Sequence, residues 1–321
     1  MKHKTEHRKN CNYVSYILAL YSKTIETLVN EGVPREIIDF QYGYKKPRRP
    51  TAAFSDFLIN RQLGDWTESL FRIEINRRLD KFKVLKYGAG GHLVAGDPEF
   101  KNFFSKYHEE ILEIGKRPDL LFYKKETINE FNLPDDISEM DQSKLSEIAK
   151  LAIAGIEVRS SRYYVSKYRE AKGKEQSFTT KLEDIPIVTH WVIKHKVPCF
   201  YTQIFFDEAH IISFEEILKI IRETGIGYIR KMEKNQRKST FYIPISKGLL
   251  VGKIYEPPTW KAEAKVLDDG RVIPYVTPQG GKMDIDVDLL IGYMNRSQKK
   301  YRARFRKGFS RDYLEKKRLE S

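Results

Sequence analysis

The strongest constraint on the fold lies between residues 153 and 207, where two apolar strand patterns flank a helix pattern. Residues 153–161 (IAGIEVRSS) and 198–207 (PCFYTQIFFD) are rich in β-branched and aromatic residues. Residues 185–196 between them have helical character, with Pro186 in the first turn, where its missing N–H costs little. A strand, a helix and a second strand in this order form a crossover, which implies a parallel pair in one sheet. We therefore predict an α/β (α+β) fold, with a mixed sheet flanked by helices.

The remaining elements divide the chain into three regions. Residues 1–58 are predicted to be helical, residues 59–225 form the core, and residues 226–321 form a smaller β-rich subdomain that ends in a basic helix. Residues 117–124 (RPDLLFYK) have a compact strand pattern, and the polar, acidic residues 125–142 indicate a loop or insertion. Helices are predicted over residues 13–30, 59–73, 144–153 and 214–224, the last opened by a capping box of Ser213 and Glu216.

Charge narrows the class of partner. The chain carries 58 Lys and Arg against 44 Asp and Glu, a net charge of +14, which favours a polyanion: nucleic acid first and an anionic membrane surface second. Residues 296–321 alone hold 11 − 3 = +8. Their aromatic residues recur every fourth position and predict an amphipathic helix, which either docks on the domain or contacts phosphates.

Other partners and compartments are disfavoured. No apolar run approaches the roughly 18 residues of a membrane helix, and the first ten residues contain no apolar signal core. Two cysteines are too few for a disulfide framework or a multi-cysteine zinc site. We therefore expect a soluble, cytoplasmic protein that makes no stable membrane attachment.

Two acids are placed where they can act together. Asp119 lies at the start of one predicted strand, directly after Pro118, and Glu157 lies in the middle of the next. If these strands are neighbours, the two carboxylates converge, which suits a hard divalent ion such as Mg²⁺. Arg159 is two residues beyond Glu157 and shares its face of the strand, so a cation lies beside the acid. A metal ion and a fixed cation are the minimum machinery for phosphodiester hydrolysis.

These segments resemble a known family. The segment RPD at 117–119 followed by IEVRSS at 156–161 looks like the motif of the PD-(D/E)XK nuclease superfamily, and the helix NRQLGDWTE at 60–68 is similar to the opening helix of many restriction endonucleases. Residues 177–218 are similar to AccI-like type II restriction enzymes, so the resemblance covers about residues 60–224. It implies a mixed-sheet nuclease core and Mg²⁺-dependent cleavage of double-stranded DNA at a short sequence by a homodimer. It also implies metal binding by Asp119 and Glu157, with Glu68 as an accessory acid.

One position departs from the family pattern. Arg159 stands where the motif usually has lysine, and arginine cannot exchange a proton near neutral pH. Its guanidinium can clamp the scissile phosphate, or Lys181 can reach the same point from elsewhere.

Less specific interpretations stay open for each acid. Asp119 can be a turn residue, Glu157 can form a structural pair with arginine, and Glu68 can close a capping box that begins at Asp65. The chain also fits a DNA-repair or homing nuclease, or a DNA-binding regulator with a degraded nuclease site. Base-reading residues are expected in three basic segments: residues 161–174, 230–238 and the terminal helix.

Overall fold

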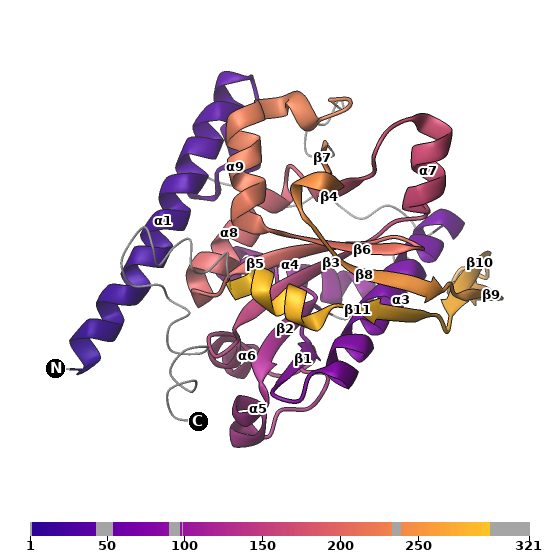
Figure 1. The fold of residues 1–321 in the computed structure, drawn as a ribbon, viewed down its shortest axis with the longest axis horizontal. Coiled ribbons are helices and arrows are strands. Elements are labelled where there is room, and N and C mark those ends of the chain that lie inside the picture. The colour runs from indigo at the N-terminus through magenta and orange to yellow at the C-terminus, as the bar shows by residue number, and fades with distance from the viewer. Residues whose placement is uncertain (1, 43–53, 90–96, 98, 233–238, 296–321) are drawn as a thin grey trace.

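The computed structural model describes residues 2–42, 54–89, 97, 99–232 and 239–295, with side chains from Tyr13 onward (Figure 1). At its centre is a seven-stranded mixed sheet in the order β1-β2-β3-β5-β6-β8-β11. The strands are β1 (Phe82–Lys86), β2 (Leu120–Lys124), β3 (Ala154–Ser160), β5 (Cys199–Ile204), β6 (Glu208–Ser213), β8 (Leu249–Glu256) and β11 (Lys282–Ile285). The basic helix predicted over 296–321 lies outside the described residues. Within those residues, no helix is both long and apolar enough to cross a bilayer.

The predicted crossover is confirmed. β3 and β5 are parallel neighbours, with Glu157 aligned to Tyr201, while every other neighbouring pair in this sheet is antiparallel. The chain passes from β3 to β5 through α7 (Val165–Lys172), β4 (Ser177–Lys181) and α8 (Asp184–His195). Both faces of β5 are covered, so its residues are buried throughout, which explains why four of its six residues are apolar. The mixed α/β class follows as predicted.

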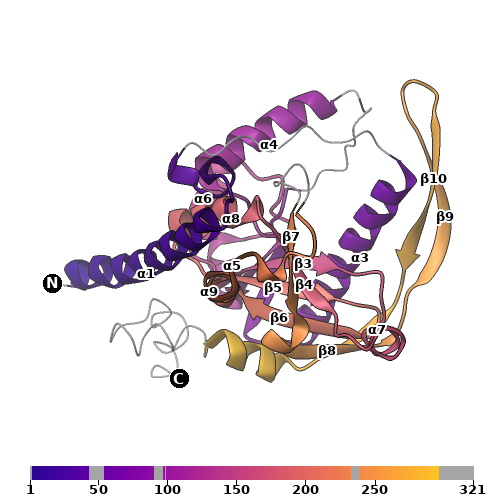
Figure 2. The same cartoon turned by 90° about the horizontal axis from the view of Figure 1, so that it is seen from above.

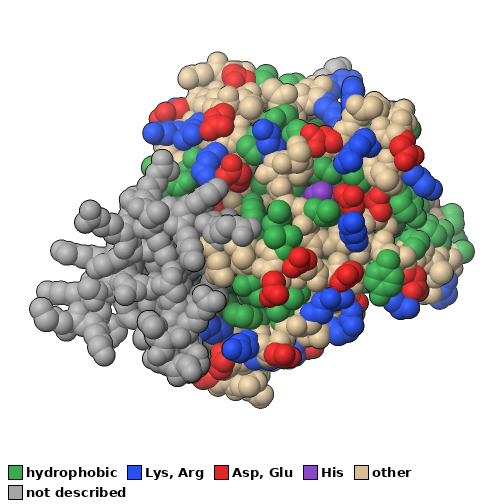
Figure 3. All heavy atoms as spheres, viewed as in Figure 1, with side chains coloured by type: hydrophobic (Ala, Val, Ile, Leu, Met, Phe, Trp, Pro, Cys, Tyr) green, Lys and Arg blue, Asp and Glu red, His purple; other side chains and the backbone are tan. Residues whose placement is uncertain are grey.

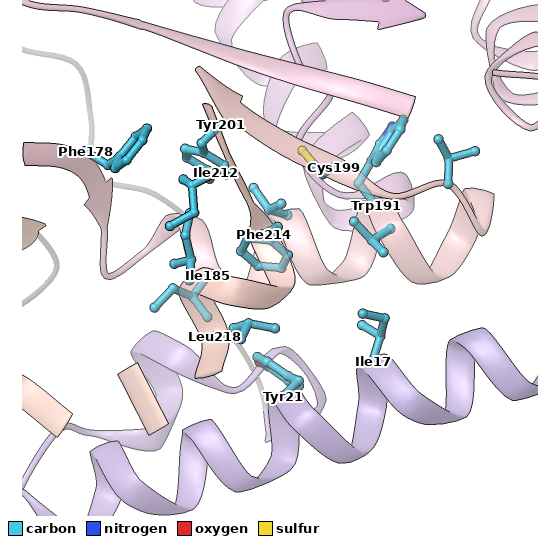
Figure 4. Packing of buried hydrophobic residues seen from close by; sticks show 14 of the residues in the cluster. Ile17, Tyr21, Phe178, Ile185, Trp191, Cys199, Tyr201, Ile212, Phe214 and Leu218 are labelled. Atoms are coloured by element: carbon cyan, nitrogen blue, oxygen red, sulfur yellow. The ribbon is translucent and has the colours of Figure 1, made fainter. Parts of the chain in front are cut away.

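Three helices cover one face of the sheet. Figure 4 shows Tyr21 of α1 (Lys2–Asn30) next to Leu218 of α9 (Phe214–Thr224) and Ile17 pointing into the same layer, in one cluster with Trp191 of α8 and Tyr201 of β5. α9 begins as the sequence predicts, because the Ser213 side chain accepts a hydrogen bond from the Glu216 N–H at 3.2 Å. This face holds the larger apolar cluster, so α1 is an integral part of the core.

α3 (Ser55–Arg78) covers the opposite face. Its residues Leu63, Leu70 and Phe71 are buried against Leu120 of β2 and Ile156 of β3. The loop predicted for residues 125–142 is wrong in its first half, which forms α5 because Thr127 and Ile128 are buried. The remaining short helices are α2 (Arg35–Ile38), α4 (Phe100–Ile114), α5 (Lys125–Phe131), α6 (Gln142–Ala149), η1 (Phe40–Tyr42), η2 (Gly225–Tyr228) and η4 (Ile245–Lys247).

The strands after residue 239 do not form a sheet of their own. β8 and β11 extend the central sheet, and β7 (Thr240–Pro244) pairs with β4. β9 (Thr259–Val266) and β10 (Val272–Gln279) pair with each other in an antiparallel hairpin alongside α3 (Figure 2). The domain limits proposed at residues 58 and 225 stay a prediction; the first falls inside α3, and the second separates strands that share one sheet.

Candidate active site

Asp119 and Glu157 come together at the N-terminal end of β2. β2 and β3 are antiparallel with Leu120 opposite Ile156, so Asp119, directly before β2, lies beside the part of β3 that follows Ile156 and carries Glu157. The Asp119 carboxylate Oδ2 accepts a hydrogen bond from the Val158 N–H at 2.6 Å, which ties it to β3. Asp119 is therefore more than a turn residue, since its side chain bridges the two strands.

Backbone groups directly after β1 hold Asp119 in place from the other side. The N–H groups of Tyr87 and Gly88 both donate to the Asp119 carbonyl oxygen at 2.9 Å. A Cβ at Gly88 would lie 2.9 Å from the Asp119 Cα and 3.3 Å from its Oδ1. Glycine is required there because the backbone approaches the acid so closely. Burial, and then the negative charge of Glu157, raise the pKa of Asp119 to about 7.

Glu157 lies in a buried cluster of charges. Its side chain is 3% exposed in a strand of apolar neighbours, and its Oε1 is 3.0 Å from Nη2 of Arg159. The same oxygen contacts the ammonium group of Lys116, which sequence reasoning did not single out. The expected glutamate–arginine pair is thus present, but a second cation joins it.

Asp184 completes this cluster from the first turn of α8. Its Oδ2 lies 2.5 Å from Nη2 of Arg159 and 3.7 Å from Nζ of Lys116. Burial opposes its ionisation, but the positive charges of Lys116 and Arg159 outweigh that effect and lower its pKa to about 2. The pKa values of Lys116 and Arg159 are raised in turn, because their acidic neighbours outweigh burial. Lys116, Arg159 and Asp184 therefore remain ionised around Glu157.

The position of Lys116 depends on a glycine turn. Gly115 ends α4 at φ +83, and a Cβ there would lie 2.4 Å from both the Ile187 carbonyl oxygen and the Trp191 nitrogen of α8. The Lys116 N–H donates to the same Ile187 carbonyl at 3.0 Å. The turn thus packs directly on α8 and directs Lys116 toward Glu157. The helix-ending glycine is readable in the sequence, but its contact with α8 is not.

Glu68 faces Asp119 across a pocket of about 370 Å³. Burial, followed by the charges of Asp119 and Asp65, raises the pKa of Glu68 to about 9. The capping box proposed for Asp65 and Glu68 is wrong, because α3 begins ten residues earlier, at Ser55, and both acids lie in its interior. Three cations also line the pocket: Arg61, Arg72 and Lys86.

Lys181 lies at the exposed end of β4, where its positive charge acts on Asp184. No ion pair within the described part of the chain joins it to Asp119 or Glu157. Its proposed catalytic role stays a prediction, and Lys116 is the lysine that contacts the acid.

The carboxylate oxygens that line the pocket suit a hard cation. Glu68 and Asp119 present carboxylate oxygens to one pocket, and their mutual repulsion would be relieved by a divalent ion. No group of three acidic, histidine or cysteine side chains close enough for a complete ligand set occurs in the described ranges. Water and phosphate oxygens would therefore supply the remaining ligands, as is usual for Mg²⁺.

The predicted base-reading segments are only partly described. Residues 161–174 contain α7, and there Arg162 pairs with Asp56 at 3.3 Å while Lys167 lies over the Tyr164 ring. Residues 233–238 and the terminal segment 296–321 fall outside the described residues. Which residues read bases stays open.

Comparisons with known proteins identify the family of the chain. No curated protein and no solved structure matches the chain. A family model described as AccI restriction endonuclease matches residues 19–177 and 172–301. The matched ranges span the helices on both faces, the acids of the pocket and the C-terminal strands. Because this match covers most of the sequence, the chain belongs to the AccI restriction endonuclease family, whose members are site-specific DNA endonucleases.

Proposed function

We propose that the protein is a type II restriction endonuclease that hydrolyses double-stranded DNA at a short recognition sequence with Mg²⁺ as cofactor. The observation that carries the proposal is the position of Asp119, which is hydrogen-bonded to β3 beside Glu157 and its fixed cation Arg159 and shares a pocket with Glu68, an arrangement like that of a PD-(D/E)XK nuclease. The products would be 5′-phosphate and 3′-hydroxyl ends, and the working form a homodimer. Restriction of DNA entering a cell would place the protein in the cytoplasm.

Each side chain has a distinct part in this proposal. Asp119 and Glu157 would hold the metal ion, with Glu68 assisting from α3, and Mg²⁺ bound there would supply an activated water and neutralise phosphate charge. Lys116 and Arg159 hold Glu157 in position and present positive charge to the scissile phosphate. Asp184 fixes both cations. Arg61, Arg72 and Lys86 line the pocket and attract the phosphates of the DNA backbone.

Cleavage of supercoiled plasmid in Mg²⁺ tests the proposal. The wild-type protein should yield discrete fragments, and Asp119→Asn should slow cleavage by more than about 100-fold because the metal loses a charged ligand. Asp135→Asn is the matched control: the Asp135 side chain is 60% exposed and forms an ion pair with Lys83 on the surface. Absence of cleavage by the wild type with Mg²⁺ or Mn²⁺ at every salt concentration would refute the enzymatic proposal.

Two other functions give different results in the same assay. A DNA-binding regulator with a degraded site, which Arg159 in the usual lysine position favours, would bind DNA with steep salt dependence and leave it intact. A repair or homing nuclease would cut at a structure or a long site. Mapping the fragment ends on a sequenced plasmid distinguishes both from cleavage at a short sequence.

A further inference from the structure

A buried arginine lies two residues before Asp119. Figure 3 shows Lys and Arg side chains interspersed with Asp and Glu over the visible face of the molecule. Arg117 differs from such surface cations, because only 8% of its side chain is exposed. A guanidinium with five N–H donors is costly to bury unless protein groups accept those donors. The acceptors of Arg117 therefore show which parts of the chain it holds together.

Three segments supply these acceptors. Nη1 of Arg117 donates to the Tyr87 carbonyl oxygen at 3.1 Å and to the Ser138 carbonyl oxygen at 2.9 Å. Nη2 donates to Oε2 of Glu110 on α4 at 3.1 Å, and this ion pair is largely buried. The guanidinium carbon Cζ also lies 5.4 Å from the centre of the Tyr87 ring. One side chain thus joins the turn after β1, the segment before α6, and α4.

The first two segments border the acid pocket. The N–H group of Tyr87, whose carbonyl accepts from Arg117, donates to the Asp119 carbonyl oxygen at 2.9 Å. The segment that ends at Ser138 runs beside Lys86, with backbone hydrogen bonds of 2.9 Å in both directions. Lys86 and Asp119 line the same pocket. Without Arg117, the two backbone segments beside this acid lose the donor that joins them.

The third contact reaches the segment between α4 and β2. α4, which carries Glu110, leads through Gly115 to Lys116, whose ammonium group contacts Glu157. The adjacent Arg117 contacts Glu110 instead. Two neighbouring cations thus anchor this segment to two different acids, one in the charge cluster of β3 and one on α4. The acid that follows two residues later begins from a fixed point.

We propose that Arg117 is a positioning residue of the nuclease reaction: it holds the turn after β1 against Asp119 and so fixes the carboxylate that would bind the metal ion. The inference rests on the proposed function and adds a residue that acts through Asp119. Replacing a group that orients a metal ligand typically costs about 10- to 100-fold in metal affinity or activity. A purely structural role predicts instead a loss of stability with an unchanged response to Mg²⁺.

Plasmid cleavage and thermal unfolding, each measured against Mg²⁺ concentration, test this inference. Arg117→Met should raise about tenfold or more the Mg²⁺ concentration needed for half-maximal cleavage, and likewise that needed to raise the melting temperature. DNA binding in EDTA should persist, because Arg117 is buried and the cations of the pocket remain. Arg117→Lys keeps the charge but not the fork that reaches Tyr87, Ser138 and α4 together, so its values should lie between.

Leu218→Ala is the control for lost stability. It truncates a buried side chain in the layer between α1 and α9, on elements that do not contact Arg117 in the described part of the chain. Its melting temperature should fall because a cavity remains, while its Mg²⁺ dependence stays that of the wild type.

Specific outcomes overturn the inference. An Arg117→Met variant with the Mg²⁺ dependence of the wild type refutes it. If that variant does not fold, Arg117→Lys decides: a raised Mg²⁺ requirement supports the inference, and a wild-type one refutes it. An equal rise in Leu218→Ala assigns the effect to lost stability and also refutes it. A wild type that Mg²⁺ stabilises through Arg117 but that cuts no DNA supports the inference and refutes only the nuclease proposal, so the two failures are distinguishable.

Discussion

Asp119→Asn should stabilise the metal-free protein while abolishing its activity. Asp119 is buried beside Glu157, which raises its pKa from 3.8 to about 7. An acid whose pKa is raised by folding binds its proton more tightly in the folded state, so its ionisation opposes folding. The destabilisation caused by ionised Asp119 begins above pH 3.8, grows as the pH rises, and is complete above pH 7. At about 1.4 kcal/mol per pKa unit, the shift in the pKa of Asp119 from 3.8 to about 7 corresponds to a destabilisation of at most about 4 kcal/mol.

Asparagine removes this opposition and keeps the contact with β3. It has no charge, and its amide oxygen can still accept the hydrogen bond that the Val158 N–H donates to Asp119. The free energy of unfolding of the variant should therefore exceed that of the wild type by up to about 4 kcal/mol at pH 8. The same linkage reduces the gain to about 1.5 kcal/mol at pH 5, where most wild-type Asp119 is protonated in the fold.

Urea unfolding in EDTA, followed by tryptophan fluorescence at pH 8 and pH 5, measures both values. Asp135→Asn should leave stability nearly unchanged at either pH, since its carboxylate is exposed. Adding Mg²⁺ should stabilise the wild type more than Asp119→Asn, because the ion binds the carboxylate that the variant lacks. A variant no more stable than the wild type at pH 8, or a gain that does not change with pH, refutes the reasoning.

Three further substitutions test the surroundings of the site. Lys116→Met should reduce plasmid cleavage by more than about 100-fold while DNA binding persists, and Lys116→Arg should restore part of the rate; equal losses in both variants would contradict a charge role. Gly115→Ala should lower the free energy of unfolding by about 3 kcal/mol or more, since its Cβ would overlap α8, whereas Gly270→Ala, at a similar φ with nothing within 4 Å, should cost about 1 kcal/mol in the same urea titration. Burial lowers the pKa of His195 from 6.5 to about 4, so it is neutral in the fold and stability should fall by up to about 3 kcal/mol as the pH drops from 6.5 to 4. His195→Gln should flatten that part of the pH profile, and an unchanged slope would assign it to other groups.

Prediction from the sequence succeeded where a local pattern carries the information. The parallel pair of β3 and β5 follows from strand, helix and strand in order, and the start of α9 follows from Ser213 and Glu216. It failed where local patterns compete. The acids at 65 and 68 form a plausible capping box by spacing, but α3 continues through them because the buried residues Leu63 and Leu70 lie on the same helical face on both sides.

The site shows the same division. Asp119 and Glu157 were predictable as partners, since each lies on a recognisable strand and antiparallel neighbours bring them together. Lys116 and Asp184 were not, because each reaches Glu157 or Arg159 from another element, through contacts that no spacing in the sequence encodes.

The sequence by itself determined the class of fold, the two strands near which the acids lie, and the positive charge that favours nucleic acid. These properties depend on periodicity, end signals and composition, which act over a few residues or over the whole chain at once. Only the tertiary structure decided that β8 and β11 extend the central sheet and that Lys116 joins the buried charges. It also decided that one face of the β9–β10 hairpin is exposed to solvent. Those outcomes depend on which distant segments pack together, and packing is a property of the folded chain as a whole.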